Sequence, residues 1–137
     1  MELERNPLVS AVIGCAIEVH SVLGPGLLES AYEKCLTHEF HLNGIGIERQ
    51  RVLPIDYKGI LLDCGYRVDF IVERSLVIEL KTVDRILPIH KSQVLTYLRL
   101  LQIRQGLLMN FNVALMKDGI KSVLCPLRPA ERPAFSE

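Results

Sequence analysis

The sequence predicts a single domain of the α/β (α+β) class, in which a mixed β-sheet is flanked by helices. The length of 137 residues corresponds to one ordinary domain. Hydrophobic residues make up 49% of the chain and charged residues 23%, which is the composition of a chain that buries a core. The apolar pattern changes from a helical to a strand-like period along the chain and predicts the order α-α-β-β-β-α-β-β.

Two helices are expected in the N-terminal third. Asn6-Pro7 is typical of a helix start, because Asn caps the first turn and Pro suits the first helical position. The apolar stripe of that helix consists of Val9, Val12, Ile13, Ala16 and Ile17, followed by His20, which we expect to be a core histidine. Gly24-Pro25-Gly26 ends this helix, and a second helix is predicted over residues 25–42.

Three strands are predicted next, over residues 47–57, 60–72 and 76–82. Pro54 suggests that the first strand lies at a sheet edge, because Pro cannot donate to a neighbouring strand. Lys58-Gly59 is the turn between the first two strands.

Pro88 opens a third helix, which ends at Gly106 and leads into a short buried strand over residues 107–111. Because a helix connects this strand to the strand over residues 76–82, the two are expected to be parallel neighbours. A turn at Asp118-Gly119 precedes a last strand over residues 120–124. The domain is therefore expected to span residues 1–125, with a loose tail over residues 126–137.

The charge balance gives no general argument for nucleic-acid binding, because 16 basic and 16 acidic residues cancel. The distribution is uneven, however. Residues 1–48 hold seven acids and two bases, a net charge of −5, and residues 49–137 hold nine acids and fourteen bases, a net charge of +5. The chain can therefore still form a basic face.

We expect a cytoplasmic protein. No apolar run approaches the roughly 20 residues that cross a bilayer, so no contact with a membrane is expected. The acidic N-terminus does not resemble a signal peptide. The four cysteines form no CxxC pair and are expected to be buried free thiols.

The strongest chemical signal lies in the predicted hairpin over residues 65–81. Side chains alternate along a strand, so Glu79 and Lys81 share a face. A three-residue loop at 73–75 would place Asp69 opposite Glu79, with Cβ atoms roughly 5 Å apart. Two such carboxylates repel unless a cation lies between them, and Mg²⁺ is usually held by one or two carboxylates. An exposed set of cross-strand ion pairs is the alternative, but the apolar flanks indicate central strands, where charges are rare.

Two helices carry further candidates. Glu29 and Tyr32 are three residues apart and share a face of the second helix, and Gln93 and Tyr97 are four apart on the third. Each pair alone has an ordinary explanation. Glu29 would then interact with the helix dipole, and Gln93 would be part of a polar helix flank with Tyr97 covering the core.

Taken together, these residues resemble the GxxExxY proteins, small bacterial and archaeal members of the PD-(D/E)XK nuclease superfamily. The resemblance extends over about residues 8–124. Its motifs are Gly26-x-x-Glu29-x-x-Tyr32, Tyr66-Arg67-Val68-Asp69, Glu79-Leu80-Lys81, Gln93-x-x-x-Tyr97 and Leu107-Leu108-x-Asn110-Phe111.

The resemblance implies a mixed sheet flanked by helices and a role for each matching residue. Asp69 and Glu79 match metal-binding acids, Lys81 matches the catalytic lysine, and Glu29 matches an additional acid on the first of the motif helices. Three residues are expected to bind substrate, namely Tyr32, Gln93 and Tyr97. The implied activity is hydrolysis of DNA phosphodiester bonds with Mg²⁺ (or Mn²⁺). The alternative is a nucleic-acid or protein-binding module that keeps the fold without cleaving. A homodimer is also expected, because one small domain offers little surface for holding a duplex.

Overall fold

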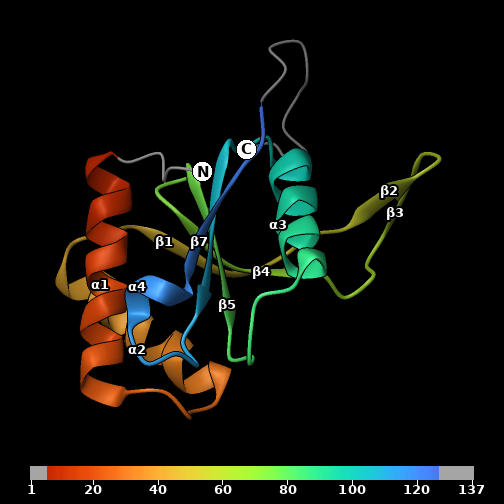
Figure 1. The fold of residues 1–137 in the computed structure, drawn as a ribbon. Coiled ribbons are helices and arrows are strands. Elements are labelled where there is room, and N and C mark those ends of the chain that lie inside the picture. Colours follow the sequence, from red (N-terminus) through yellow and green to blue (C-terminus); the bar gives the residue numbers. More distant parts are fainter. Residues whose placement is uncertain (1–5, 127–137) are drawn as a thin grey trace.

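The structure is a computed structural model that describes residues 6–126, and it contains a five-stranded mixed sheet between two layers of helices (Figure 1). The strands follow the order β1-β4-β5-β6-β7. The sheet strands are β1 (Ile47–Val52), β4 (Arg67–Val72), β5 (Leu76–Lys81), β6 (Gln105–Asn110) and β7 (Ile120–Leu124). The helices are α1 (Pro7–Leu23), α2 (Glu29–Leu42), α3 (Pro88–Leu101) and the short α4 (Met116–Gly119). This architecture confirms the predicted class.

Strand pairing confirms the two main topological predictions. β4 and β5 form an antiparallel hairpin in which Val72 pairs with Leu76. β5 and β6 are parallel, and α3 connects them. β1 lies at one edge of the sheet, as the proline at position 54 indicated.

The sheet separates two hydrophobic cores. Helices α1 and α2 cover one face, where Phe40 packs edge-on against Phe70 with ring centroids 5.4 Å apart. Helix α3 covers the other face, where Val94 and Leu98 pack with Val77. Because β4 and β5 are covered on both faces, polar side chains at their ends are partly withdrawn from water.

The first and second predicted strands are wrong in one respect, because the structure divides each of them. The first predicted strand is β1 followed by β2 (Ile55–Tyr57), and the second is β3 (Ile60–Leu62) followed by β4. β2 and β3 pair only with each other in a two-stranded ribbon that projects beside α3 (Figure 1). Pro54 follows β1, and Gly65, with a φ of 83°, precedes β4, so both breaks occur at residues unsuited to a continuous strand.

Other boundaries differ by a few residues. α2 begins at Glu29, because Gly24 and Gly26 adopt positive φ angles that a helix does not allow. α3 ends at Leu101, where Gln102 takes a left-handed conformation. The expected turn at Asp118-Gly119 is the end of the one-turn helix α4.

The described residues also test the predictions about His20, the cysteines and membrane-spanning helices. His20 is a core histidine whose Nε2 lies 2.8 Å from the Val113 carbonyl oxygen. All four cysteines are free, but only Cys15 and Cys125 are buried, so the expectation is wrong for the other two. No helix in the described part of the chain is long and apolar enough to cross a membrane. The predicted tail lies outside the described residues, except for Pro126.

We expect Gly119→Ala to destabilise the fold strongly. A Cβ atom at position 119 would lie 2.1 Å from the Asn110 backbone oxygen, a clash that only movement of β6 or α4 relieves. The expected loss is on the order of 3 kcal/mol in the free energy of unfolding. Gly14→Ala is the matched control, because nothing lies within 4 Å of the new Cβ and the position is helical, where Ala is favoured. Chemical denaturation measures the free energy of unfolding of both variants. Equal denaturation midpoints would contradict the close packing of Gly119 against the Asn110 backbone.

Candidate metal-binding acid centre

The hairpin of β4 and β5 places two carboxyl groups close to each other. Phe70 pairs with Ile78, and Asp69 and Glu79 are the next residues outward from the hairpin loop on the two strands. Both carboxyl groups are close enough for each to affect the pKa of the other. The strand pairing ends at Phe70 and Ile78, and beyond it the Asp69 carboxyl group takes the Leu80 backbone N–H.

Glu79 is the most unusual side chain of the centre. It is only 6% exposed, and its Oε2 lies 3.4 Å from the Lys81 Nζ. The other oxygen, Oε1, is buried and accepts no hydrogen bond from the described residues, and only a proton shared with Asp69 links the two carboxyl groups. Burial, reinforced by the negative charge of Asp69, raises the pKa of Glu79 to about 8, although Lys81 opposes the shift. A buried carboxylate oxygen without a partner is costly, and a cation would relieve that cost.

Asp69 is better satisfied. Its Oδ2 accepts a hydrogen bond of 2.8 Å from the Leu80 backbone N–H, and its Oδ1 accepts one of 3.1 Å from the Gln50 side chain. Burial still raises the pKa of Asp69, and the hydrogen bonds only reduce the effect. These contacts hold the carboxyl group between the strands, next to Glu79.

Glu29 approaches the same centre from the first turn of α2. Its carboxyl group accepts a hydrogen bond from the Thr82 backbone, just beyond β5, and interacts with the charges of Lys81 and Asp69. Burial is the main reason that the pKa of Glu29 is raised. The structure therefore brings together the four residues proposed from the sequence, namely Glu29, Asp69, Glu79 and Lys81.

Sequence reasoning missed a second row of contacts behind these acids. Gln50 donates from Nε2 to Glu33 Oε1 at 2.8 Å as well as to Asp69, and Arg49 forms an ion pair of 3.1 Å with Glu33. Glu33 lies one turn beyond Glu29 on α2, a spacing that could have indicated it. Gln50 has a φ of 51°, and no local signal predicts that conformation for a glutamine in a strand.

Asn110 at the end of β6 fixes the backbone that follows Lys81. Its Nδ2 donates to the Val83 carbonyl at 2.9 Å, and its Oδ1 accepts from the Val83 and Asn112 backbone N–H groups, both at 3.1 Å. The side chain is buried, so these bonds are protected from water. Asn110 belongs to the strand motif noted in the sequence, which gave the only hint of this role.

Tyr32 requires a correction. The sequence predicts that it binds substrate, but its ring is 0% exposed and stacks on Phe111 with centroids 4.5 Å apart. Its hydroxyl donates to the Gly24 carbonyl at 2.5 Å and accepts from the Leu27 N–H at 3.2 Å. Tyr32 therefore orders the loop before Glu29, and a ring without exposed surface cannot touch a substrate in this structure.

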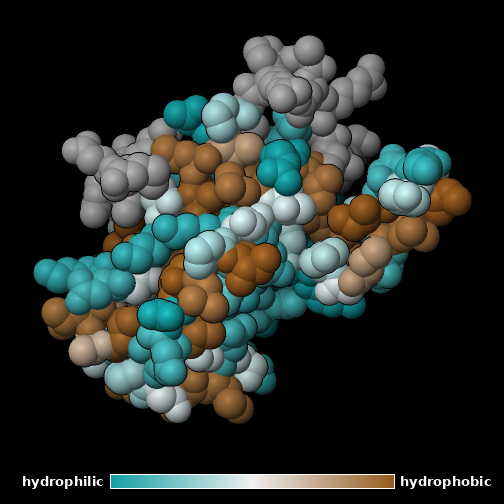
Figure 2. All heavy atoms as spheres, turned by 45° about the vertical axis from the view of Figure 1, so that its right-hand side comes forward, coloured by the Kyte–Doolittle hydropathy of each residue, from teal (hydrophilic) through white to brown (hydrophobic). Residues whose placement is uncertain are grey.

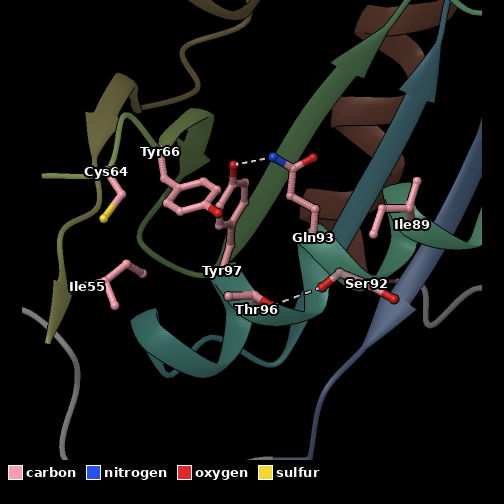
Figure 3. A pocket seen from close by; sticks show the side chains of 8 residues that line it. All are labelled: Ile55, Cys64, Tyr66, Ile89, Ser92, Gln93, Thr96 and Tyr97. Carbon is pink, nitrogen blue, oxygen red and sulfur yellow. Dashed lines mark hydrogen bonds between the residues drawn. The ribbon is translucent and has the colours of Figure 1, made fainter. Parts of the chain in front are cut away.

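Gln93 and Tyr97 lie on α3 beside the acid centre. The Gln93 Nε2 donates to the Tyr97 hydroxyl at 2.8 Å, and burial together with the charge of Glu79 raises the pKa of Tyr97 to about 12. Both residues also line a pocket of about 680 Å³ between α3 and the base of the ribbon (Figure 3). Tyr66 forms the opposite wall and meets the Tyr97 ring edge-on at 6.4 Å.

The donor set fits a hard divalent cation held by few protein ligands. Carboxylate oxygens are the ligands that Mg²⁺ prefers, and it usually keeps several waters. Glu79 Oε1 accepts no hydrogen bond, and the Asp69 carboxyl group is close enough to raise the pKa of Glu79. Within residues 6–126, no group of three or more His, Cys, Asp or Glu side chains is arranged as a metal cage. Asp69 and Glu79 are therefore the two residues that could hold such a cation, together with water.

Comparison with known proteins agrees with the fold. The sequence model described as "PD-(D/E)XK nuclease superfamily" matches residues 6–123, and no curated protein matches the chain. A solved structure described as "Crystal structure of SSO0001" is 22% identical, over 94% of this chain and 72% of that chain. Its TM-score of 0.43 is too low to support any argument. The match over residues 6–123 shows that the chain belongs to the PD-(D/E)XK nuclease superfamily.

Proposed function

We propose that this protein is a Mg²⁺- or Mn²⁺-dependent nuclease that hydrolyses DNA phosphodiester bonds, and that it belongs to the GxxExxY branch of its superfamily. Membership of the superfamily supports phosphodiester chemistry. The branch is supported by the spacing of Gly26, Glu29 and Tyr32, together with the approach of Glu29 to the acids of β4 and β5.

One observation carries the proposal, namely the unpartnered Oε1 of Glu79 beside Asp69. A structural ion pair would satisfy both carboxylate oxygens, as buried charges are normally paired. Here Lys81 reaches only Oε2, and burial holds the pKa of Glu79 far above its usual range. Strongly shifted acids of this kind are typical of functional sites.

Each residue then has a defined task. Asp69 and Glu79 would hold the cation, and Glu29 would contribute directly or through water. A bound Mg²⁺ supplies stabilisation of negative charge on the phosphoryl oxygens. Lys81 lies beside Glu79. From there its ammonium group would orient the attacking water by a hydrogen bond and would stabilise negative charge on the phosphoryl oxygens. Gln93 and Tyr97 form the wall of the centre on the α3 side and would contact the substrate.

A non-cleaving binding module remains the second candidate, because the described residues form no three-ligand metal cage and the net charge of the chain is zero. Under that alternative, nucleic-acid or protein binding would not depend on Asp69 or on a divalent ion.

We expect divalent-ion-dependent cleavage of single- or double-stranded DNA, reduced at least about 100-fold in Asp69→Asn and Lys81→Ala. The readout is the rate of product formation with Mg²⁺, with Mn²⁺ and with a chelator. Matched controls are Asp118→Asn and Lys121→Ala, whose side chains are exposed on α4 and β7 and should leave the rate unchanged. Binding of DNA without cleavage, unaffected by Asp69→Asn, would support the second candidate.

We also expect the stability of the metal-free protein to fall as pH rises through about 8. The pKa of Glu79 is raised from 4.5 to about 8, so the folded chain holds this proton more tightly than the unfolded chain does. The resulting stabilisation is complete below pH 4.5 and is lost as pH rises through about 8. Glu79→Gln should remove most of this pH dependence in thermal melts with a chelator.

Divalent ions should restore the stability lost at high pH. At 10 to 100 times the dissociation constant, Mg²⁺ or Mn²⁺ should add on the order of 1–3 kcal/mol to the free energy of unfolding. Asp69→Asn should abolish this gain, whereas Asp118→Asn should retain it. If wild type and Asp69→Asn respond equally to the ion, Asp69 is not a ligand.

A further inference from the structure

The ribbon of β2 and β3 is an unsupported part of the fold. Its two strands have three residues each and pair with no other strand. Only Ile55 is half-buried, and every other residue from position 56 to 62 is exposed. A two-stranded ribbon alone is marginally stable in water at best. We therefore expect a binding partner to cover the β2–β3 ribbon.

The exposed surface of the ribbon is apolar over a contiguous stretch. Figure 2 shows hydrophobic side chains along the ribbon, which projects at the right of the view. Three consecutive residues, Ile60, Leu61 and Leu62, are exposed together with Tyr57. Isolated exposed apolar residues are ordinary, but a run of this kind marks an interaction surface or a risk of aggregation.

A concave apolar surface lies next to this convex one. The pocket of about 680 Å³ begins at Ile55 at the base of the ribbon and continues along α3 to Ile89. Figure 3 shows Tyr66 and Tyr97 between these two residues, and the pocket volume exceeds what one Leu or Ile side chain fills. One molecule thus presents a ridge, which is the β2–β3 ribbon, and a groove, which is the pocket beside α3, on the same side. A two-fold interface between identical chains requires such a pair of matching surfaces.

Charge and area favour a second copy over nucleic acid. Within residues 55–62, Asp56 and Lys58 cancel, so the ribbon has no positive surplus for a phosphate backbone. A standard interface buries roughly 800 Å² per partner, and seven large apolar side chains of the ribbon, the pocket and the start of α3 are exposed here. They are Tyr57, Ile60, Leu61, Leu62, Tyr66, Leu87 and Ile89.

We propose that the protein forms a two-fold homodimer in which the β2–β3 ribbon of each copy occupies the pocket beside α3 of the other. Two consequences follow. The ribbon gains the apolar support that its own chain does not supply. The ribbon of the second copy also lies next to Gln93 and Tyr97, so each acid centre acquires a wall from the other chain. The interface does not depend on metal binding or on cleavage, so its test is independent of the proposed nuclease activity.

Light scattering coupled to size exclusion tests the proposal at micromolar concentrations. The wild type is expected at twice the chain mass of 15.5 kDa. Leu61→Lys on the ridge and Ile89→Lys in the groove should each give a folded chain of 15.5 kDa, because both side chains are exposed and support no core. Leu42→Lys is the matched control, since Leu42 on α2 is 66% exposed and Leu61 is 69% exposed. The control should remain dimeric.

Hydrogen exchange locates the interface independently. Amides of residues 55–62 and 89–97 should exchange more slowly in the concentrated wild type than in Leu61→Lys. A wild-type mass of 15.5 kDa throughout, or a dimer that persists in Leu61→Lys, would overturn the proposal. A monomeric wild type that loses DNA binding on Leu61→Lys would also overturn it, because the ribbon would then serve nucleic acid.

Discussion

The closeness of Asp69 and Glu79 on the β4–β5 hairpin is the constraint on which the site depends. Like charges that lie close together and partly out of water destabilise each other. The hairpin nevertheless holds them in place, because Val72 and Leu76 pair at its loop and both faces of the sheet are covered by helices. One backbone N–H and one lysine offset part of the cost. The remaining imbalance, at Glu79 Oε1, is what makes the centre fit a cation.

The other elements can be understood by what they bring to this pair. α2 delivers Glu29, whose position depends on the loop that the buried Tyr32 orders. β6 supplies Asn110, which fixes the backbone beyond Lys81. α3 supplies Tyr97, which stands between the acids and the pocket at the base of the ribbon. The pocket at the base of the ribbon therefore lies beside the acid centre.

Local rules predicted the hairpin centre, because side-chain alternation and loop length depend on few residues. The parallel pair of β5 and β6 followed from the helix between them. The conformation of Gln50 and the burial of Tyr32 depend on tertiary contacts, which the sequence pattern does not show. The left-handed Gln50 is held by Glu33 and Asp69 from distant elements, and Tyr32 is buried because Phe111 stacks on it. The ribbon also escaped prediction, since alternating apolar residues look alike whether a strand joins the main sheet or leaves it.

The central claim is that Glu79 is a buried acid whose charge a divalent cation compensates. The most direct measurement is a pH titration of the ¹³C chemical shift of its side-chain carboxyl group, with a chelator and then with Mg²⁺. The account predicts a pKa of about 8 without metal and a clearly lower value when Mg²⁺ is present. A pKa near 4.5 under both conditions would contradict it.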